Sequence, residues 1–227
     1  MKRSEINACI KDMESLIKKH GFELPPFCHW TPEEWQDKNH EYDEIRDNML
    51  GWDITDYGLG DFSKVGFSLI TLRNGNQNNP KYKKVYAEKL LMLKEGQHSP
   101  MHFHWNKSED IINRGGGTLI IHVYNDDNGE LGDSDVMVNS DGRTYSVPAG
   151  TGVLLHPGES ITLWPHQYHD FDVVEGTGDV LIGEVSMCND DNTDNRFYEK
   201  VGRFPTIEED EPPYRLLCNE YPGAAET

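Results

Sequence analysis

The chain has 227 residues, a usual length for one all-β domain with helical additions, so we expect a single domain. Its 21 Lys and Arg residues against 40 Asp and Glu residues give a formal charge of −19, which would repel nucleic-acid phosphates and anionic lipid surfaces and so excludes nucleic acid and membrane as partners. No apolar run approaches the roughly 18 to 20 residues that cross a bilayer, and neither a signal peptide nor closely spaced cysteines indicate export, so a cytoplasmic protein is expected.

Residues 1–60 are expected to form a helical extension. Apolar residues recur there at helical spacing, namely Ile6, Ile10, Met13 and Ile17. Ser4 is expected to cap this first helix, and Gly21 is expected to end it. A second helix start is predicted at Thr31, because Glu34 stands at the third position of a capping box. Helical character continues after it, with a break.

Residues 61–200 have the pattern of short β-strands. The runs with β character are 67–72, 85–93, 118–124, 152–156, 160–164 and 180–185. Turn-forming pairs such as Asn128-Gly129 and Asp141-Gly142 separate several of them. No alternation of strands and helices is visible in this region, which favours a sandwich or barrel over a doubly wound α/β fold. Residues 201–227 are expected to form an irregular tail on the surface.

A pair of histidines in the β region gives the first chemical signal. His102 and His104 are two positions apart, so on a strand both imidazoles would point to one side, where they could bind one ion. Glu109 could begin the next strand and bring a carboxylate to the same ion. Such ligands suit Mn, Fe, Co, Ni or Zn, and the ligand set does not choose among them. A His-x-His pair alone also occurs by chance, as hydrogen-bonded surface or core residues.

The stretch around this pair resembles the first conserved motif of the cupin superfamily. The motif has glycine, five residues, His-x-His, four residues, glutamate, six residues and glycine, and it is matched in register by Gly96, His102, His104, Glu109 and Gly116. This resemblance implies a mainly β fold, a cupin jelly-roll β-barrel, with a divalent metal inside its mouth.

The second cupin motif begins as expected and then departs. Gly142 and Gly150 match its glycines, but Val153 stands where its histidine ligand is expected. The fourth ligand must come from later in the chain, where His166 and His169 lie three residues apart and so on opposite faces of a regular strand. His169 is preferred, because it stands among apolar and aromatic residues, whereas His166 follows a proline and is expected in the turn.

Nearly the whole chain is similar to the D-lyxose isomerase family of cupins, which are aldose-ketose isomerases acting on D-lyxose and D-mannose. The similarity rests on the helical extension, on the stretch His102–Ile111 and on the stretch Gly183–Phe197, the last of which generic cupins lack. It implies interconversion of D-lyxose and D-xylulose, and of D-mannose and D-fructose, with Mn²⁺ as the expected metal and Zn²⁺, Co²⁺ or Fe²⁺ as alternatives. It also implies a small-molecule sugar substrate and a homodimer.

Isomerisation assigns roles to further residues. Glu184 is expected to be the general base that moves a proton from C2 to C1 through a cis-enediolate, with a metal-assisted hydride shift as the competing route. Lys94 is expected to donate to a substrate oxygen, and the resemblance implies that Asp190 and Arg196 bind sugar hydroxyls. In the alternative interpretation, all four side chains are ordinary surface, capping or ion-pair groups.

Two other functions compete with this hypothesis. One is a different metal-cupin enzyme, either an iron-dependent dioxygenase or a phosphosugar isomerase, because one fold hosts many reactions. A phosphate would call for clustered Arg or Lys, whereas the segments around the ligands are acidic, which favours a free sugar. The other is a non-catalytic sugar-binding module, which normally accompanies a DNA-binding domain, and no basic helix-turn-helix is visible.

Overall fold

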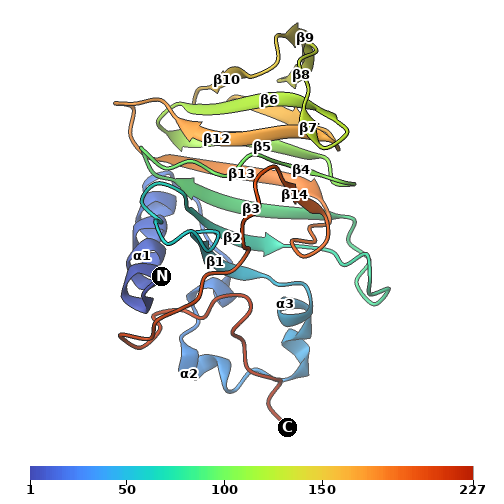
Figure 1. The fold of residues 1–227 in the computed structure, drawn as a ribbon. Coiled ribbons are helices and arrows are strands. Elements are labelled where there is room, and N and C mark those ends of the chain that lie inside the picture. Colours follow the sequence, from blue (N-terminus) through green and yellow to red (C-terminus); the bar gives the residue numbers. More distant parts are fainter. Residues whose placement is uncertain (227) are drawn as a thin grey trace.

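The computed structural model describes residues 1–226, which form two facing β-sheets with helices against one outer side (Figure 1). The helical segments are α1 Arg3–Lys19, η1 Pro26–His29, α2 Pro32–Trp35, η2 His40–Tyr42 and α3 Asp43–Asp47. The strands are β1 Gly51–Thr55, β2 Phe67–Arg73, β3 Tyr86–Leu93, β4 His102–His104, β5 Glu109–Gly116, β6 Leu119–Asp127, β7 Glu130–Leu131, β8 Val136–Ser140, β9 Arg143–Val147, β10 Thr151–Leu155, β11 Ser160–Leu163, β12 Gln167–Val173, β13 Val180–Met187 and β14 Asn195–Phe197.

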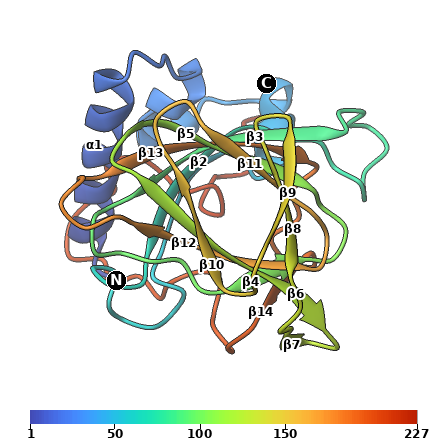
Figure 2. The ribbon, with the colours of Figure 1, turned by 90° about the horizontal axis from the view of Figure 1, so that it is seen from above.

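The strands are antiparallel throughout both sheets. One sheet has the order β1-β2-β3-β13-β5-β11-β8-β9, and the other has the order β10-β6-β12-β4-β14 with β7 beside β6. Seen from above, the two sheets curl around a common interior (Figure 2). This arrangement confirms the predicted mainly β fold with an N-terminal helical extension. The boundary expected at residue 60 is wrong, because the helices end at Asp47 and β1 already belongs to the eight-stranded sheet.

The interior is filled by apolar side chains from both sheets. Buried members include Leu91, Ile111, Ile121, Val138 and Leu163. Val153, which occupies the position of the missing motif histidine, packs into this core at 6% exposure. Since an apolar side chain stands there, β10 contributes no ligand, and a fourth ligand has to come from another strand.

Helix α1 covers the outer face of the eight-stranded sheet. Its predicted apolar face is buried, with Ile6, Ile10, Met13 and Ile17 at 0 to 2% exposure. This face packs in a second core against residues of β1, β2 and β3, among them Ile54, Ile70 and Leu90. These four residues recur with the 3.6-residue period of a helix, so they lie on one side of α1. That side is the one that covers the sheet. No helix within residues 1–226 is both long and apolar enough to cross a membrane.

The helix boundaries are partly as expected. Gly21 has φ +70° directly after the helix, which fits the predicted stop. At Thr31 the predicted capping box is present, since the Glu34 amide donates to Thr31 Oγ1 at 3.2 Å and the Thr31 amide donates to Glu34 Oε2 at 2.8 Å. Ser4 as the cap of α1 is wrong, because the helix already begins at Arg3. The Ser4 amide and hydroxyl donate to the Asp210 carboxylate instead.

The last 26 described residues, 201–226, contain no helix or strand and run along α1 and β1. Backbone bridges join Glu208 to Lys2 and Leu217 to Trp52. The Arg3 guanidinium, 2% exposed, forms ion pairs with Glu209 and Glu220 of this tail. The tail thereby holds α1 and the edge strand β1 together, and it places Arg203 beside the barrel interior.

Candidate active site

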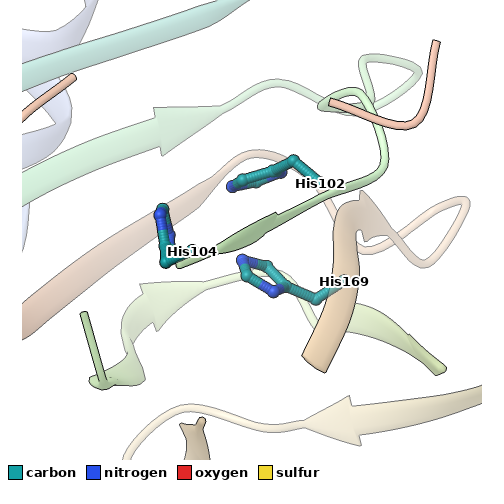
Figure 3. A group of neighbouring side chains, drawn as sticks. All are labelled: His102, His104 and His169. Carbon is teal, nitrogen blue, oxygen red and sulfur yellow. The ribbon is translucent and has the colours of Figure 1, made fainter. Parts of the chain in front are cut away.

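Three histidines from two neighbouring strands converge in the barrel interior. His102 and His104 lie on β4 and point to the same side, and the register of β4 with β12 places His169 directly opposite His102. Figure 3 shows the three rings facing one space. Their ligand atoms lie within 4.8 Å of one another, and all three side chains are buried. The predicted convergence of these imidazoles is therefore present.

The histidines are held with lone pairs free to bind a metal. Nδ1–H of His102 donates to the Pro100 carbonyl at 2.8 Å, and Nδ1–H of His169 donates to the Gln167 carbonyl at 2.9 Å. A carbonyl only accepts, so in the neutral form of either ring the lone pair is on Nε2. Burial, reinforced by His169 and His104, holds the pKa of His102 well below its ordinary value, and burial followed by Lys107 lowers the pKa of His104.

Glu109 opens β5 and brings a carboxylate to the same place. Its Oε1 lies 3.4 Å from Nε2 of His104 and 3.3 Å from Nε2 of His169. Burial alone would raise the pKa of this carboxyl, but Lys107 and then His104 outweigh it and hold the pKa well below the ordinary value. Imidazoles beside an ionised carboxylate are a fitting ligand set for a divalent ion.

His166 lies outside this group. It occupies the turn before β12 with φ +63°, its side chain is 48% exposed, and its Nδ1 lies 3.4 Å from Asp126 Oδ2. The sequence hypothesis placed His166 in the turn and His169 on the strand, and the structure has both residues there.

A buried network of lysines and carboxylates adjoins the histidines. Nζ of Lys107 lies 2.7 Å from Glu109 Oε2 and donates to Glu184 Oε1 at 2.9 Å. Lys89 Nζ lies 3.2 Å from the same Glu184 oxygen and donates to Asn189 Oδ1 at 2.6 Å. Burial alone would lower the pKa of Lys107, but Glu109 and Glu184 outweigh it and raise the pKa. Glu184 is thus 4% exposed inside the cavity and is not a solvated strand-end residue.

Lys94 is not part of the cavity, so its predicted role as a donor to the substrate is wrong. It follows the last residue of β3 and pairs with Asp12 of α1 on the outer side of the sheet. The lysine of β3 that lines the cavity is Lys89, which is 4% exposed. The signal for it was a single lysine within the otherwise mostly apolar run of β3.

Asp190 and Arg196 are also not brought into the cavity. Arg196 is the middle residue of β14, so it points away from its neighbours Asn195 and Phe197, which line the cavity, and its Nη2 donates to the Gly129 carbonyl. Asp190 accepts from the Asn192 amide and the Thr193 hydroxyl within its own turn. Their predicted contacts with sugar hydroxyls are therefore not supported.

The cavity is lined instead by Asp191 and Arg203, which lie close together in space. Neither residue was singled out from the sequence. Asp191 and Arg203 form an ion pair at 2.9 Å, and Arg203 also pairs with Asp53 of β1. Burial alone would raise the pKa of Asp191, but Arg203, then Lys89 and Lys107, hold it well below the ordinary value. No sequence signal marked Arg203, because it stands in the irregular tail.

Together these residues can perform polar chemistry on a small neutral molecule. The site offers three histidines that could hold a metal ion, a buried carboxylate at Glu184 and cationic donors at Lys89, Lys107 and Arg203. Five apolar side chains also line the cavity, namely Phe67, Leu69, Leu91, Phe171 and Phe197. Polar and charged side chains outnumber them, which suits a polar small molecule.

Comparisons with known proteins agree with this chemistry. A model of the D-lyxose isomerase family matches residues 1–221. Two proteins called D-lyxose/D-mannose isomerase are similar over 97% of this chain and 98% of their own length, at 47% identity in Serratia proteamaculans and 46% in Escherichia coli O157:H7.

Solved structures of sugar isomerases share the fold. The L-ribose isomerase of Cellulomonas parahominis without ligand superposes with a TM-score of 0.59 at 15% identity, and that of Acinetobacter sp. DL28 with L-ribose superposes with 0.58 at 13%. Both alignments cover 92% of this chain and 98% of the other. By the match of its sequence over residues 1–221, the chain belongs to the D-lyxose isomerase family.

Proposed function

We propose that this protein is a metal-dependent aldose-ketose isomerase that interconverts D-lyxose with D-xylulose and D-mannose with D-fructose. The observation that carries the proposal is the group of three buried histidines next to Glu109, with the Glu184 carboxylate in the same cavity. The relatives called D-lyxose/D-mannose isomerase, which match nearly the whole chain, support these sugars as substrates.

The metal would be held by His102, His104, His169 and Glu109, with Mn²⁺ as the proposed ion and Zn²⁺, Co²⁺ or Fe²⁺ as alternatives. One feature of the chain supports binding. Nε2 of His169 is buried without a hydrogen-bond partner among the described residues, and such an orphaned nitrogen is costly unless something binds it. A bound divalent ion supplies polarisation of the sugar's carbonyl and neighbouring hydroxyl, and it favours negative charge on their oxygens.

Glu184 is the proposed general base. The contacts from Lys89, Lys107 and Ser186 all reach its Oε1, and within residues 1–226 no bond to Oε2 is found, so Oε2 can face the substrate. In the forward direction it takes the proton from C2 of the aldose, and the electrons of that C–H bond form the C1–C2 double bond of a cis-enediolate. The same carboxyl then returns the proton to C1, while the O2 proton passes to O1, which yields the ketose.

Lys107 is proposed to assist this transfer. Its ammonium lies within reach of both Glu109 and Glu184 and can donate to an oxygen that becomes negative in the enediolate. It also holds the Glu184 carboxylate in place, since a buried carboxylate without a partner would be strongly destabilised.

The charges in the cavity favour a free sugar over a phosphosugar. Lys89 and Lys107 are neutralised by Glu184 and Glu109, and Arg203 is neutralised by two aspartates. No unpaired cluster of cations is therefore offered to a phosphate among the residues that line the cavity. An uncharged polyhydroxy substrate fits this balance.

The function is tested by incubating the Mn²⁺-loaded protein with D-lyxose and with D-mannose and measuring ketose. Ketose formation is the expected result. Oxygen uptake without ketose would indicate a dioxygenase, and sugar binding without turnover would indicate a binding module. In D₂O, proton transfer predicts deuterium at C1 of the ketose, whereas a hydride shift predicts none.

We also propose that the protein is a cytoplasmic homodimer. All four cysteines, Cys9, Cys28, Cys188 and Cys218, are buried free thiols, which suits a reducing compartment. The dimer follows from the family resemblance, and sedimentation tests it directly.

A further inference from the structure

Arg203 lies on the β1 side of the cavity, and Glu109 lies on the β5 side. Asp53, the partner of Arg203, is on β1, the edge strand of the eight-stranded sheet, whereas Glu109 is on β5. The strands β2, β3 and β13 lie between them, with adjacent strands about 4.8 Å apart. The metal ligands and the Arg203 guanidinium therefore mark two sides of one cavity, and both sides contribute to its lining.

The guanidinium is fixed by two carboxylates but is not saturated by them. Nη2 of Arg203 carries the contacts to both Asp53 and Asp191, so one nitrogen makes both ion pairs. Nη1 is buried and has no hydrogen-bond partner among the described residues. A buried donor without an acceptor is unfavourable, so this position is suited to an acceptor that arrives with a ligand or with water.

The surroundings select the kind of acceptor. Since Asp53 and Asp191 already balance the guanidinium charge, an anion gains little here, and a neutral hydroxyl oxygen is the better match. The ring of Phe197 and the side chain of Leu69 line the same cavity and would pack against C–H groups. A polyol segment presents both features.

We propose that Nη1 of Arg203 binds the sugar hydroxyl farthest from the carbonyl, and that Asp53 and Asp191 orient it for this contact. The proposal rests on the proposed isomerase function, because that function places the carbonyl end at the metal ligands. Arg203 thus determines specificity, because it binds the far end of the substrate. The reacting end is held at the metal ligands His102, His104, His169 and Glu109.

The test compares D-lyxose with 5-deoxy-D-lyxose, which lacks only the terminal hydroxyl. The wild-type protein is expected to prefer D-lyxose in kcat/KM by at least about tenfold, as for a buried hydrogen bond to a charged group. In Arg203→Lys, which keeps the charge but lacks Nη1, this preference should fall toward one. The preference should fall because KM for D-lyxose rises, while KM for the deoxy sugar changes little.

Arg196→Lys is the matched control, because Arg196 bonds to Gly129 outside the cavity. It should keep the wild-type preference. A calorimetric titration with the alcohol obtained by reducing D-lyxose, which cannot isomerise, gives a readout without turnover, and Arg203→Lys should weaken this binding about tenfold.

The outcomes separate the two proposals. Absence of D-lyxose turnover in the wild-type protein would reject the isomerase, whatever Arg203 does. Normal turnover with an unchanged preference in Arg203→Lys, or an equal loss on both sugars, would reject the role of Arg203 alone. If circular dichroism shows that Arg203→Lys is unfolded, Asp191→Asn replaces it, since it loosens the guanidinium without removing it, and an unchanged preference in that variant overturns the proposal.

Discussion

Each buried charge in the cavity has a partner of opposite sign, and this pairing decides what single substitutions do. Lys107 lies between Glu109 and Glu184, and Lys89 contacts the same oxygen of Glu184 as Lys107 does. Bringing an ion into a protein interior costs several kcal/mol unless it is paired, so these residues stabilise one another only as a set.

Replacing Lys107 by methionine is therefore expected to lower the free energy of unfolding of the metal-free protein by about 3–5 kcal/mol, because Glu109 loses its ammonium partner. Denaturant titration measures it. Lys94→Met is the control: this lysine is 32% exposed and its partner Asp12 is 54% exposed, so the loss should stay below about 1 kcal/mol. Equal losses in the two variants would contradict the account of the buried network.

The ligand assignment predicts a difference between two nearby histidines. His169→Ala should lose most bound metal, since it removes one of three converging imidazoles, whereas His166→Ala, in the exposed turn, should keep it. Metal per chain after dialysis is measured by elemental analysis. The assignment fails if His169→Ala retains a full equivalent.

Glu184→Gln separates binding from proton transfer. The amide keeps the size of the side chain but cannot accept the C2 proton, so kcat should fall by about 10²- to 10⁴-fold while metal content is unchanged. Glu175→Gln, at an exposed position, should behave as wild type. Near-normal turnover in Glu184→Gln would remove it as the base.

The sequence predicted the side chains whose position follows from a strand's period, and it failed where the face of a residue depended on tertiary contacts. His102 and His104 share a face because they are two residues apart on β4. The same period explains why the prediction for Arg196 was not supported. On β14 this residue points outward, between two residues that point into the cavity. Arg203 has no local pattern, because its position comes from an irregular segment docking on β1.

Among the elements, the C-terminal tail acts as a clamp on α1. The guanidinium of Arg3 is buried at 2% exposure between Glu220 and Glu209, which are 20% and 57% exposed. The carboxylates of the tail thus neutralise the Arg3 guanidinium, for which the apolar face of α1 offers no partner.

Glu220→Gln should lower the free energy of unfolding by about 1–3 kcal/mol, because it removes the more buried carboxylate facing Arg3. Glu209→Gln, with the same chemistry at a more exposed position, should cost less than about 1 kcal/mol. Thermal or denaturant unfolding distinguishes them, and a reversed order would mean that the tail is held by other contacts.

The six predicted strands correspond to β2, β3, β6, β10, β11 and β13. The Asp141-Gly142 pair forms the predicted tight turn between β8 and β9, with φ +48° and +78°. Strand β1 was not predicted, although apolar and polar residues alternate in it from Trp52 to Thr55, because this short stretch falls within residues 1–60, which were expected to be helical. Its two faces serve different purposes, since Trp52 and Ile54 pack toward α1 while Asp53 pairs with Arg203.

At the scale of the whole molecule, the proposed dimer has a direct test. The outer face of β3 and β13 exposes apolar side chains, Tyr86 at 46%, Val185 at 43% and Met187 at 43%. Such a face is more readily tolerated when another subunit covers it. Sedimentation equilibrium should therefore give twice the chain mass of 26.0 kDa. A species at the chain mass, unchanged by concentration, would contradict the dimer.

The ion pair between Asp53 and Arg203 joins positions 150 residues apart. A nascent polypeptide therefore cannot close the sugar-binding end of its cavity until almost all of the chain has been synthesised, although the histidines of β4 and β12 are available earlier. Any species that lacks the final segment, whether during translation or after cleavage of the tail, would retain the imidazoles for an ion yet leave Asp53 without its cation. By the proposed role of Arg203, such a species would lack the contact to the far end of the sugar.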